Sequence, residues 1–348
     1  MSSKRQGSEL QIPKTKRFKP LKRFELAKGW LLDGPLGIPS LCDIVEGYSQ
    51  DLEGVLSLTM VGHTESVTGL ALLPDDSVAS SSFDGTVRVW DTTTGQCLRT
   101  LRGEHVDQFG FDFPIRALIV LPDGNLALGF EGDDTVCVWD ALSGKCMRKF
   151  LGHINSVCAL ASLPDGNLAS GSLDRTVRVW DVTTGVSKLT LTGHTDAVTS
   201  LLVLKDGKLA SGSHDCTIRL WDTMSGACIF TLTGHTNRIC ALTLLHDGKF
   251  LSSSYDGTLR VWDNGTHSLT HIHPTRDTFC TLITLPNGHL AAGEFGPSVQ
   301  MLDASNGQCL LTIQSATKDN GHYVSAFATL RDSKLAAGDT QGHVHVWH

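Results

Sequence analysis

Four groups of residues in this chain combine a histidine, a hydroxyl and an aspartate, the types that build a nucleophile, its base and an orienting acid in hydrolases. In each group the serine follows the histidine by 17 residues, and an aspartate and a tryptophan follow at fixed intervals. The four groups are His63/Ser80/Asp84/Trp90, His153/Ser170/Asp174/Trp180, His194/Ser211/Asp215/Trp221 and His235/Ser252/Asp256/Trp262.

A catalytic triad is needed only once in an enzyme, so four copies indicate a repeated structural device. A buried indole N–H needs an acceptor, and a buried histidine and aspartate can satisfy each other. The sequence contains no phosphate-binding loop and no nucleophile elbow. We therefore predict four structural hydrogen-bond sets, no catalytic residues and no enzymatic activity.

The elements that carry these groups recur along the chain. Trp139, Trp180, Trp221 and Trp262 lie 41 residues apart, each followed by aspartate, and Leu302 takes the place of a tryptophan in a weaker sixth copy. Each unit contains four β-rich runs separated by turns such as Asp206-Gly207. Four strands cannot bury both of their faces alone, so seven such units must stack radially.

The ends of the chain predict how this ring closes. The last unit stops after its third strand, while residues 56–60 precede Gly62-His63 in the register of an outer strand. We predict an all-β fold, a seven-bladed β-propeller of four-stranded antiparallel blades over residues 53–348, in which the N-terminal strand completes the C-terminal blade and removes the open edge. We expect the closure region to be the least stable part.

From Leu56 to His348 these features together resemble the WD40-repeat proteins. The resemblance implies a non-catalytic protein-interaction scaffold that binds a peptide or protein segment on the top face, around the central channel. It also implies three channel-lining positions per blade. The third of these is occupied by Thr68, Arg116, Cys158, Thr199, Cys240, Cys280 and Ser325.

Aromatic residues and arginine are the usual anchors of binding hot spots, so we favour the channel-lining residues of these types. The predicted partner-binding residues are Phe83, Arg116, Leu173, His214, Arg238, Tyr255, Phe295 and Tyr323. The second unit is eight residues longer than the others, which predicts a rim loop containing Phe109, Phe111 and Phe113 that either grips a partner or covers the channel.

The chain shows no pattern that predicts a cofactor or a metal. His343, His345 and His348 have no acidic partner at a ligand spacing, so an exposed strand face is the favoured interpretation. Most of the ten cysteines occupy repeated positions and there is no C-x-x-C, so we interpret them as small buried hydrophobic residues in a reducing compartment. We expect a cytoplasmic protein, with the nucleus as an alternative, and no membrane span.

The N-terminal region is basic and precedes an acidic body. Residues 1–23 carry a net charge of +7 in a chain of −7. We expect residues 1–30 to be a flexible tail, either merely solvated or acting in nuclear import or in binding to an anionic surface. Residues 31–52 predict a short helical extension, and residues 36–48 weakly resemble part of an F-box.

The F-box resemblance would make the chain a substrate-recognition subunit that binds a ubiquitin ligase scaffold. The basic tail offers another alternative, a nucleic-acid-associated factor, which we disfavour as a partner class. The alternative for residues 31–52 is a helix packed against the propeller. Our leading expectation is a protein or peptide partner of unknown identity and a chain that is monomeric by itself.

Overall fold

The computed structural model describes residues 56–103, 112–275, 278–294, 296, 298–314 and 323–347, with Gln314 and Asp332 described by their backbone only. The described residues form 28 strands in seven four-stranded antiparallel sheets, and one short 3-10 helix, η1 (Arg331–Ser333). The predicted tail over residues 1–30 and extension over residues 31–52 lie outside the described residues, and they stay predictions.

Each sheet is one blade, and we number the blades in chain order. Blades 1 to 3, with strands given from the centre outward, are β2 (Val67–Leu72), β3 (Val78–Ser82), β4 (Thr86–Trp90), β5 (Cys97–Arg102); β6 (Ile115–Val120), β7 (Leu126–Phe130), β8 (Val136–Trp139), β9 (Cys146–Phe150); and β10 (Val157–Ser162), β11 (Leu168–Ser172), β12 (Val177–Trp180), β13 (Ser187–Leu191).

Blades 4 to 7 continue the pattern, and the last blade takes its outermost strand from the beginning of the chain. These blades are β14 (Val198–Val203), β15 (Leu209–Ser213), β16 (Ile218–Trp221), β17 (Cys228–Leu232); β18 (Ile239–Leu244), β19 (Phe250–Ser254), β20 (Thr258–Asp263), β21 (Ser268–Pro274); β22 (Phe279–Thr284), β23 (Leu290–Glu294), β24 (Ser298–Leu302), β25 (Cys309–Gln314); and β26 (Val324–Thr329), β27 (Leu335–Asp339), β28 (His343–Trp347), β1 (Leu56–Val61).

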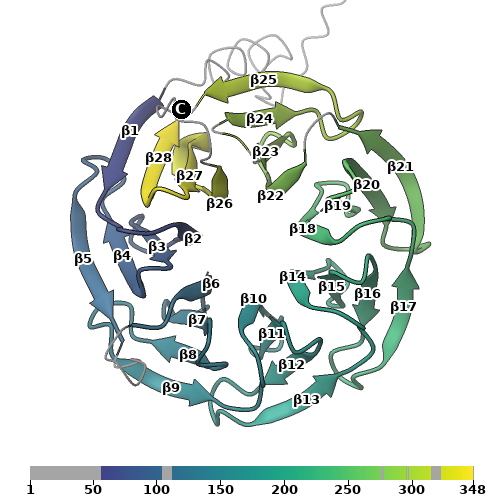
Figure 1. Cartoon of the computed structure of the whole chain (residues 1–348), viewed down its shortest axis with the longest axis horizontal. Coiled ribbons are helices and arrows are strands. Elements are labelled where there is room, and N and C mark those ends of the chain that lie inside the picture. The colour runs from purple at the N-terminus through teal and green to yellow at the C-terminus, as the bar shows by residue number, and fades with distance from the viewer. Residues whose placement is uncertain are drawn as a thin grey trace, which may run out of the picture. The chain divides into compact units, whose positions relative to one another are not determined.

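The seven blades form a closed ring around a central axis (Figure 1). Each innermost strand contacts the innermost strands of both neighbouring blades, and β26 contacts β2. Outer strand β1 pairs antiparallel with β28, from Leu56 opposite Trp347 to Val61 opposite His343. The prediction of a seven-bladed propeller in which the N-terminal strand completes the last blade is confirmed.

The core lies between neighbouring blades. The second strand of most blades is buried at every residue, as in β15, because it has sheet neighbours on both sides and blades above and below. Outer strands alternate, so that β13 buries Leu191 and exposes Lys188 and Thr190. Trp221 packs against the cluster of the preceding blade, which shows how an indole fastens one blade to the next.

The tight turns follow the sequence pattern. Gly207, in the Asp206-Gly207 turn between β14 and β15, has φ 84°, a left-handed conformation that glycine adopts without steric cost. The Gly207 N–H donates to the Leu204 carbonyl at 2.9 Å. Such turns keep consecutive strands adjacent, so each blade folds as a meander and the same residue positions recur at the same end of every blade.

Candidate functional site

The structure brings each of the four predicted hydrogen-bond sets together. In blade 4, His194 lies with Nδ1 2.8 Å from Asp215 Oδ2 and Nε2 2.7 Å from Ser211 Oγ. The Trp221 indole N–H donates to the same Ser211 Oγ at 2.8 Å. The other three sets show the same bonds with distances of 2.7–2.8 Å.

The serines of these sets are enclosed within the blades, whereas the described residues predicted to contact a partner are half-buried or exposed. Each serine hydroxyl accepts the indole N–H of its own blade and contacts the histidine Nε2. A serine nucleophile must face the substrate that it attacks. None of the four serines of the sets has exposed surface; they are Ser80, Ser170, Ser211 and Ser252. These four serines are therefore accessible neither to a substrate nor to a partner, and their position serves the packing of the blade.

Burial and hydrogen bonding act in opposite directions on the aspartates of these sets. Burial of Asp215 favours its neutral form, but hydrogen bonds from His194 and Thr217 outweigh burial and hold the Asp215 pKa well below its usual range. Asp84 and Asp174 behave in the same way, and the pKa of Asp256 falls to about 2. Each aspartate therefore stays ionised and paired within its blade.

The inner strand of every blade has a β-bulge at its beginning. In blade 4, Val198 lies opposite Ser213 and Ser200 lies opposite Gly212, which leaves Thr199 as the extra residue. The bulged residues of the seven blades are the seven third channel-lining positions, Thr68, Arg116, Cys158, Thr199, Cys240, Cys280 and Ser325. A bulge re-aims a side chain and is common beside functional sites. The sequence pattern did not reveal it.

We call the side on which the inner strands begin the top face. The first channel-lining position of a blade is the residue after its second strand, and the second position is the residue before its inner strand. Across this edge, the backbone N–H at the first position donates to the carbonyl at the second position. Examples are Phe83 to Ser66 at 3.0 Å and Tyr255 to Arg238 at 3.1 Å. The same bond occurs in blades 3, 4 and 7, from Leu173, His214 and Thr340, and in blade 2 from Glu131, which the sequence had not assigned to this position. The structure thus assembles the predicted positions at one edge of the ring.

Some of the bulged residues have a structural task. The Thr68 hydroxyl donates to the Ile115 carbonyl of the next blade at 2.7 Å, and the Thr199 hydroxyl donates to the Ile239 carbonyl at 3.1 Å. The Ser325 hydroxyl likewise donates to the Val67 carbonyl across the closure of the ring. These hydroxyls join neighbouring inner strands, so they are engaged within the protein.

Two arginines stack on aromatic rings of the top face. The Arg116 guanidinium carbon lies 5.5 Å from the Phe83 ring centre, and Arg116 Nε donates to Glu131 Oε2 at 2.8 Å. Burial alone would lower the Arg116 pKa, but the bond to Glu131 raises it. The Arg238 guanidinium carbon lies 3.9 Å from the Tyr255 ring centre, within the range of a cation–π contact.

An open pocket of about 180 Å³ lies beside this second pair. It is lined by Thr199, His214, Arg238, Ile239, Cys240, Tyr255 and Cys280. Burial raises the pKa of Tyr255, Cys240 and Cys280 to about 12. Burial, followed by the charge of Arg238, lowers the pKa of His214. At neutral pH the Arg238 guanidinium is therefore the one charged group among the lining residues.

The other predicted partner-binding residues are more dispersed. Leu173 and Tyr323 are half-buried on the top face, and Phe113 packs partly buried against the blade 2 core. Phe295 lies outside the described residues, as do Phe109 and Phe111 of the predicted rim loop.

Larger pockets lie at the opposite end of the strands. One of about 380 Å³ is lined by residues of blades 3 and 4 that include Asp165, Lys208 and Asp222. Another, of about 260 Å³, is lined by the corresponding residues of blades 1 and 2, among them Asp75 and Asp140. Because these pockets recur with the repeat, we attribute them to blade spacing. The top-face pocket is lined by residue types that differ between blades, which favours a specific role there.

The interpretation of the outer-strand cysteines as buried hydrophobic residues was wrong. Cys97, Cys228 and Cys309 are exposed. They begin the outermost strands, where alternate side chains face solvent. The Cys228 sulfur lies 3.5 Å from the Arg219 guanidinium and contacts the Phe230 carbonyl.

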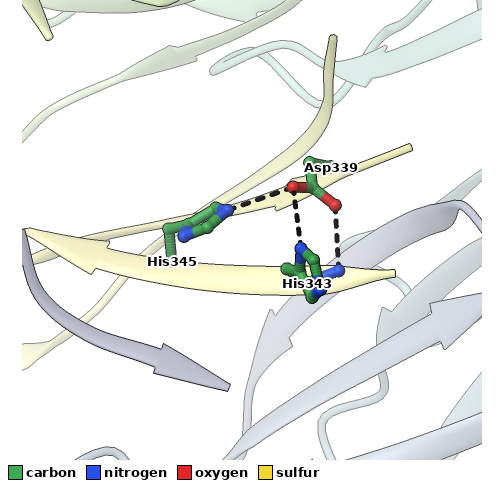
Figure 2. A group of neighbouring side chains, drawn as sticks. All are labelled: Asp339, His343 and His345. Carbon is green, nitrogen blue, oxygen red and sulfur yellow. Dashed lines mark hydrogen bonds and ion pairs between the residues drawn. The ribbon is translucent and has the colours of Figure 1, made fainter. Parts of the chain in front are cut away.

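The interpretation of His343 and His345 as an exposed face without an acidic partner was also wrong. His345 is 1% exposed and Asp339 is 3% exposed. His345 Nε2 lies 3.1 Å and His343 Nδ1 lies 3.4 Å from Asp339 Oδ2 (Figure 2). The turn between β27 and β28 folds the aspartate back onto the strand. The spacing Asp-x-x-x-His-x-His across a predicted hairpin was the signal that sequence reasoning missed.

Comparison with known proteins defines the class of this fold. Residues 54–91, 144–181, 185–222 and 226–263 match the WD40 family, described as WD domain, G-beta repeat. These segments contain every residue of the four complete hydrogen-bond sets. The structure resembles the crystal structure of the WD40 beta propeller domain of Doa1 with a TM-score of 0.71, at 24% identity over 84% of this chain and 96% of that chain. The protein is a seven-bladed β-propeller that contains four WD40 repeats, as the sequence predicted.

Individual relatives are similar over short segments only. WD repeat-containing protein pop1 of Schizosaccharomyces pombe is 53% identical over 45 residues, which are 13% of this chain and 6% of that protein. Nuclear distribution protein PAC1 of Coccidioides posadasii is 32% identical over 115 residues, 30% of this chain and 23% of that protein. The matches thus span less than a quarter of these relatives.

WD40 propellers generally serve as protein-interaction scaffolds and are typically non-catalytic. The part of the chain that the structure describes contains no helix long and apolar enough to cross a membrane.

Proposed function

We propose that this propeller is a non-catalytic scaffold that binds a peptide or protein segment on its top face, and that an acidic group of the partner binds Arg238. The observation that carries the proposal is the stacking of exposed Arg238 on Tyr255, 3.9 Å from the ring centre, beside an open pocket with no other charged lining residue.

Comparison of the two stacked arginines supports the choice of Arg238. Arg116 is neutralised by Glu131 within the protein. Among the described residues, Arg238 makes no ion pair. Its guanidinium is held over the Tyr255 ring, so it offers a planar donor fork that matches a carboxylate and loses little freedom on binding. Desolvation in the neutral pocket would strengthen that contact.

The proposal is tested by affinity capture from a cell extract followed by peptide mapping of the retained partner. We expect Arg238→Ala to weaken retention about tenfold or more, because hot-spot arginines contribute at least about 1.4 kcal/mol. Retention should also decrease as the salt concentration rises, because salt screens the attraction between Arg238 and the acidic group. Lys208→Ala, at the opposite end of the strands, is the matched control and should retain the partner. Equal retention by both folded variants would contradict the proposal.

Two other proposals concern the N-terminal region. Residues 21–50 would recruit a ubiquitin ligase scaffold if the F-box resemblance holds, and the basic tail would bind nucleic acid in the other alternative. Both depend on residues outside the described part of the chain. Deleting residues 1–50 distinguishes these two proposals from binding at the top face. If the top face binds the partner, the deletion variant should still retain it.

The cytoplasm, with the nucleus as alternative, is the proposed compartment, and the proposed oligomeric state is a monomer. The nine described cysteines form no disulfide with one another, which supports a reducing environment.

A further inference from the structure

We propose that Asp339, His343 and His345 form a binding site for one divalent transition-metal ion of the Zn²⁺ type in blade 7. Two imidazole nitrogens and one carboxylate oxygen are donors that such ions prefer. The three donor atoms lie within 4.8 Å of one another. Figure 2 shows both histidines on β28, directed toward the carboxylate of Asp339.

Local structure explains why the three residues meet. His343 and His345 are alternate residues of one strand, so their side chains share a face of the sheet. Asp339 ends β27, and the tight turn through Gly342, with φ 85°, brings it back beside β28.

Two of the three ligand spacings are close to those of a tetrahedral ion. Zinc lies about 2.0–2.2 Å from nitrogen and oxygen ligands, which places neighbouring ligand atoms roughly 3.3–3.6 Å apart. The Asp339 Oδ2 to His343 Nδ1 distance is 3.4 Å, and the distance to His345 Nε2 is 3.1 Å. The third pair, His343 Nδ1 and His345 Nε2, lies within 4.8 Å, so binding would draw the two imidazoles together by up to roughly 1.5 Å. His343 has 24% of its side chain exposed, which provides a route for the ion.

Hydrogen bonds already orient two of the three ligands. The backbone N–H groups of Gln341 and His343 each donate to Asp339 Oδ1 at 2.9 Å, which leaves Oδ2 directed at the imidazoles. His345 Nδ1 lies 3.2 Å from the Thr59 hydroxyl. A hydroxyl both donates and accepts, so Thr59 can support the tautomer in which Nε2 binds metal.

His343 supplies an independent observation. Its Nδ1 atom is buried and makes no hydrogen bond with any described residue, although Asp339 Oδ2 is 3.4 Å away. A buried nitrogen without a hydrogen-bond partner is destabilising, and in the tautomer that carries its proton on Nε2 the Nδ1 lone pair faces the carboxylate oxygen and is repelled by it. A cation placed between these two atoms would satisfy both.

Blade 6 shows that an acid at this position does not by itself make such a site. Glu294 occupies the place of Asp339 and contacts Ser298 and Gln300, which occupy the places of the two histidines. That trio has the same topology but no imidazole. It is therefore a matched control within the same chain.

The site would also reinforce closure of the ring. Thr59 belongs to β1, Asp339 to β27 and the histidines to β28. A metal ion would therefore tie β27 to β28, and the contact between Thr59 and His345 would extend this link to β1, in one of the blades that lack a complete hydrogen-bond set.

The test is a calorimetric titration of the full-length, chelator-stripped protein with Zn²⁺, alongside Co²⁺ absorption spectroscopy. We expect one equivalent to bind. Removing one ligand with His343→Ala should weaken binding about 100-fold or more, and Thr59→Val roughly 10- to 100-fold. Glu294→Gln should leave affinity unchanged. Mg²⁺ and Ca²⁺, which prefer all-oxygen sites, should not compete.

The cobalt spectrum distinguishes this site from zinc binding at the exposed cysteines. Binding at Asp339, His343 and His345 gives visible d–d bands without the intense thiolate-to-cobalt band in the near ultraviolet. His343→Ala should remove those visible bands while its far-ultraviolet circular dichroism matches the wild type. The proposal is overturned if wild type binds no Zn²⁺, if binding produces thiolate bands, or if folded His343→Ala binds as tightly as wild type.

Discussion

Blades 4 and 7 have the same four-strand topology but differ in whether the indole N–H of the buried tryptophan has a hydrogen-bond partner. In blade 4, Trp221 donates to Ser211, and Ser211 also binds His194. In blade 7, Ala337 stands where Ser211 does, and the buried Trp347 indole N–H has no hydrogen-bond partner among the described residues. The blade closes nonetheless, because β1 pairs with β28 and buries Met60.

This difference teaches that the hydrogen-bond set is one of several ways to stabilise a blade. Blade 2 also lacks the serine, and its Trp139 N–H is likewise buried without a partner in the described part of the chain, but Phe130 packs against the indole ring at 6.0 Å between centroids. Blade 7 instead has a polar trio displaced by two residues from the position of Asp215. Packing between blades maintains the architecture even where the polar groups differ. Some polar groups are therefore not needed to hold a blade together and can serve another role.

The largest expected effect comes from breaking the closure of blade 7. Deleting residues 1–60 removes β1, exposes the edge of β28 and loses the burial of Met60, whereas deleting residues 1–50 keeps β1. We expect the longer deletion to lower the free energy of unfolding by more than about 4 kcal/mol relative to the shorter one. Chemical denaturation monitored by tryptophan fluorescence measures this difference. Equal stabilities would show that β1 is dispensable.

The next largest effect concerns the hydrogen-bond set of blade 4. Ser211→Ala leaves the Trp221 N–H and His194 Nε2 without their shared partner, so we expect a loss of about 2–4 kcal/mol in the free energy of unfolding. The same denaturation experiment measures it.

The reciprocal change, Ala337→Ser in blade 7, is the matched control. It offers Trp347 an acceptor at the same position, and we expect a gain of about 0.5–1 kcal/mol. Destabilisation by both changes would indicate that blade 7 has repacked around its alanine.

The smallest expected effect is a change in acid sensitivity. The pKa of Asp215 is lower in the folded state than in the unfolded chain, where it is near 3.9. Its contribution to stability is therefore complete above the unfolded pKa, roughly above pH 5, and is lost as pH falls through the folded pKa.

Asp215→Asn cannot take up this proton. We expect proton uptake on unfolding near pH 3 to fall by about one relative to wild type, which flattens the dependence of the free energy of unfolding on pH. Denaturation curves between about pH 5 and pH 2.5 measure the slope. An unchanged slope would mean that Asp215 titrates alike in both states.

Much of the architecture could be predicted from the sequence. The tryptophan spacing and the Asp-Gly turns predicted seven four-stranded units, because each unit repeats the same local requirements. The position of residues 56–60 predicted the closure. The composition of each hydrogen-bond set followed from its fourfold recurrence.

Other features could not be predicted from the sequence. The spacing predicted that Thr199 and Cys240 share a position, but not that each is the extra residue of a bulge, since a bulge depends on strand pairing. The pattern placed Arg116 and Arg238 equally on the top face. Glu131 neutralises Arg116, and no such partner faces Arg238 among the described residues.

The sequence by itself determined the strands, the turns and the number of blades. Backbone geometry and alternate burial constrain neighbouring residues, so they produce a periodic pattern of residue types. Tertiary structure alone decided which polar groups outside the repeated hydrogen-bond sets are paired. Asp339 reaches His343 and His345 only through a folded hairpin, and His345 meets Thr59 only when residues nearly 300 apart in the chain join in one sheet. Such contacts depend on which individual side chains face one another across the paired strands, which residue spacing does not encode.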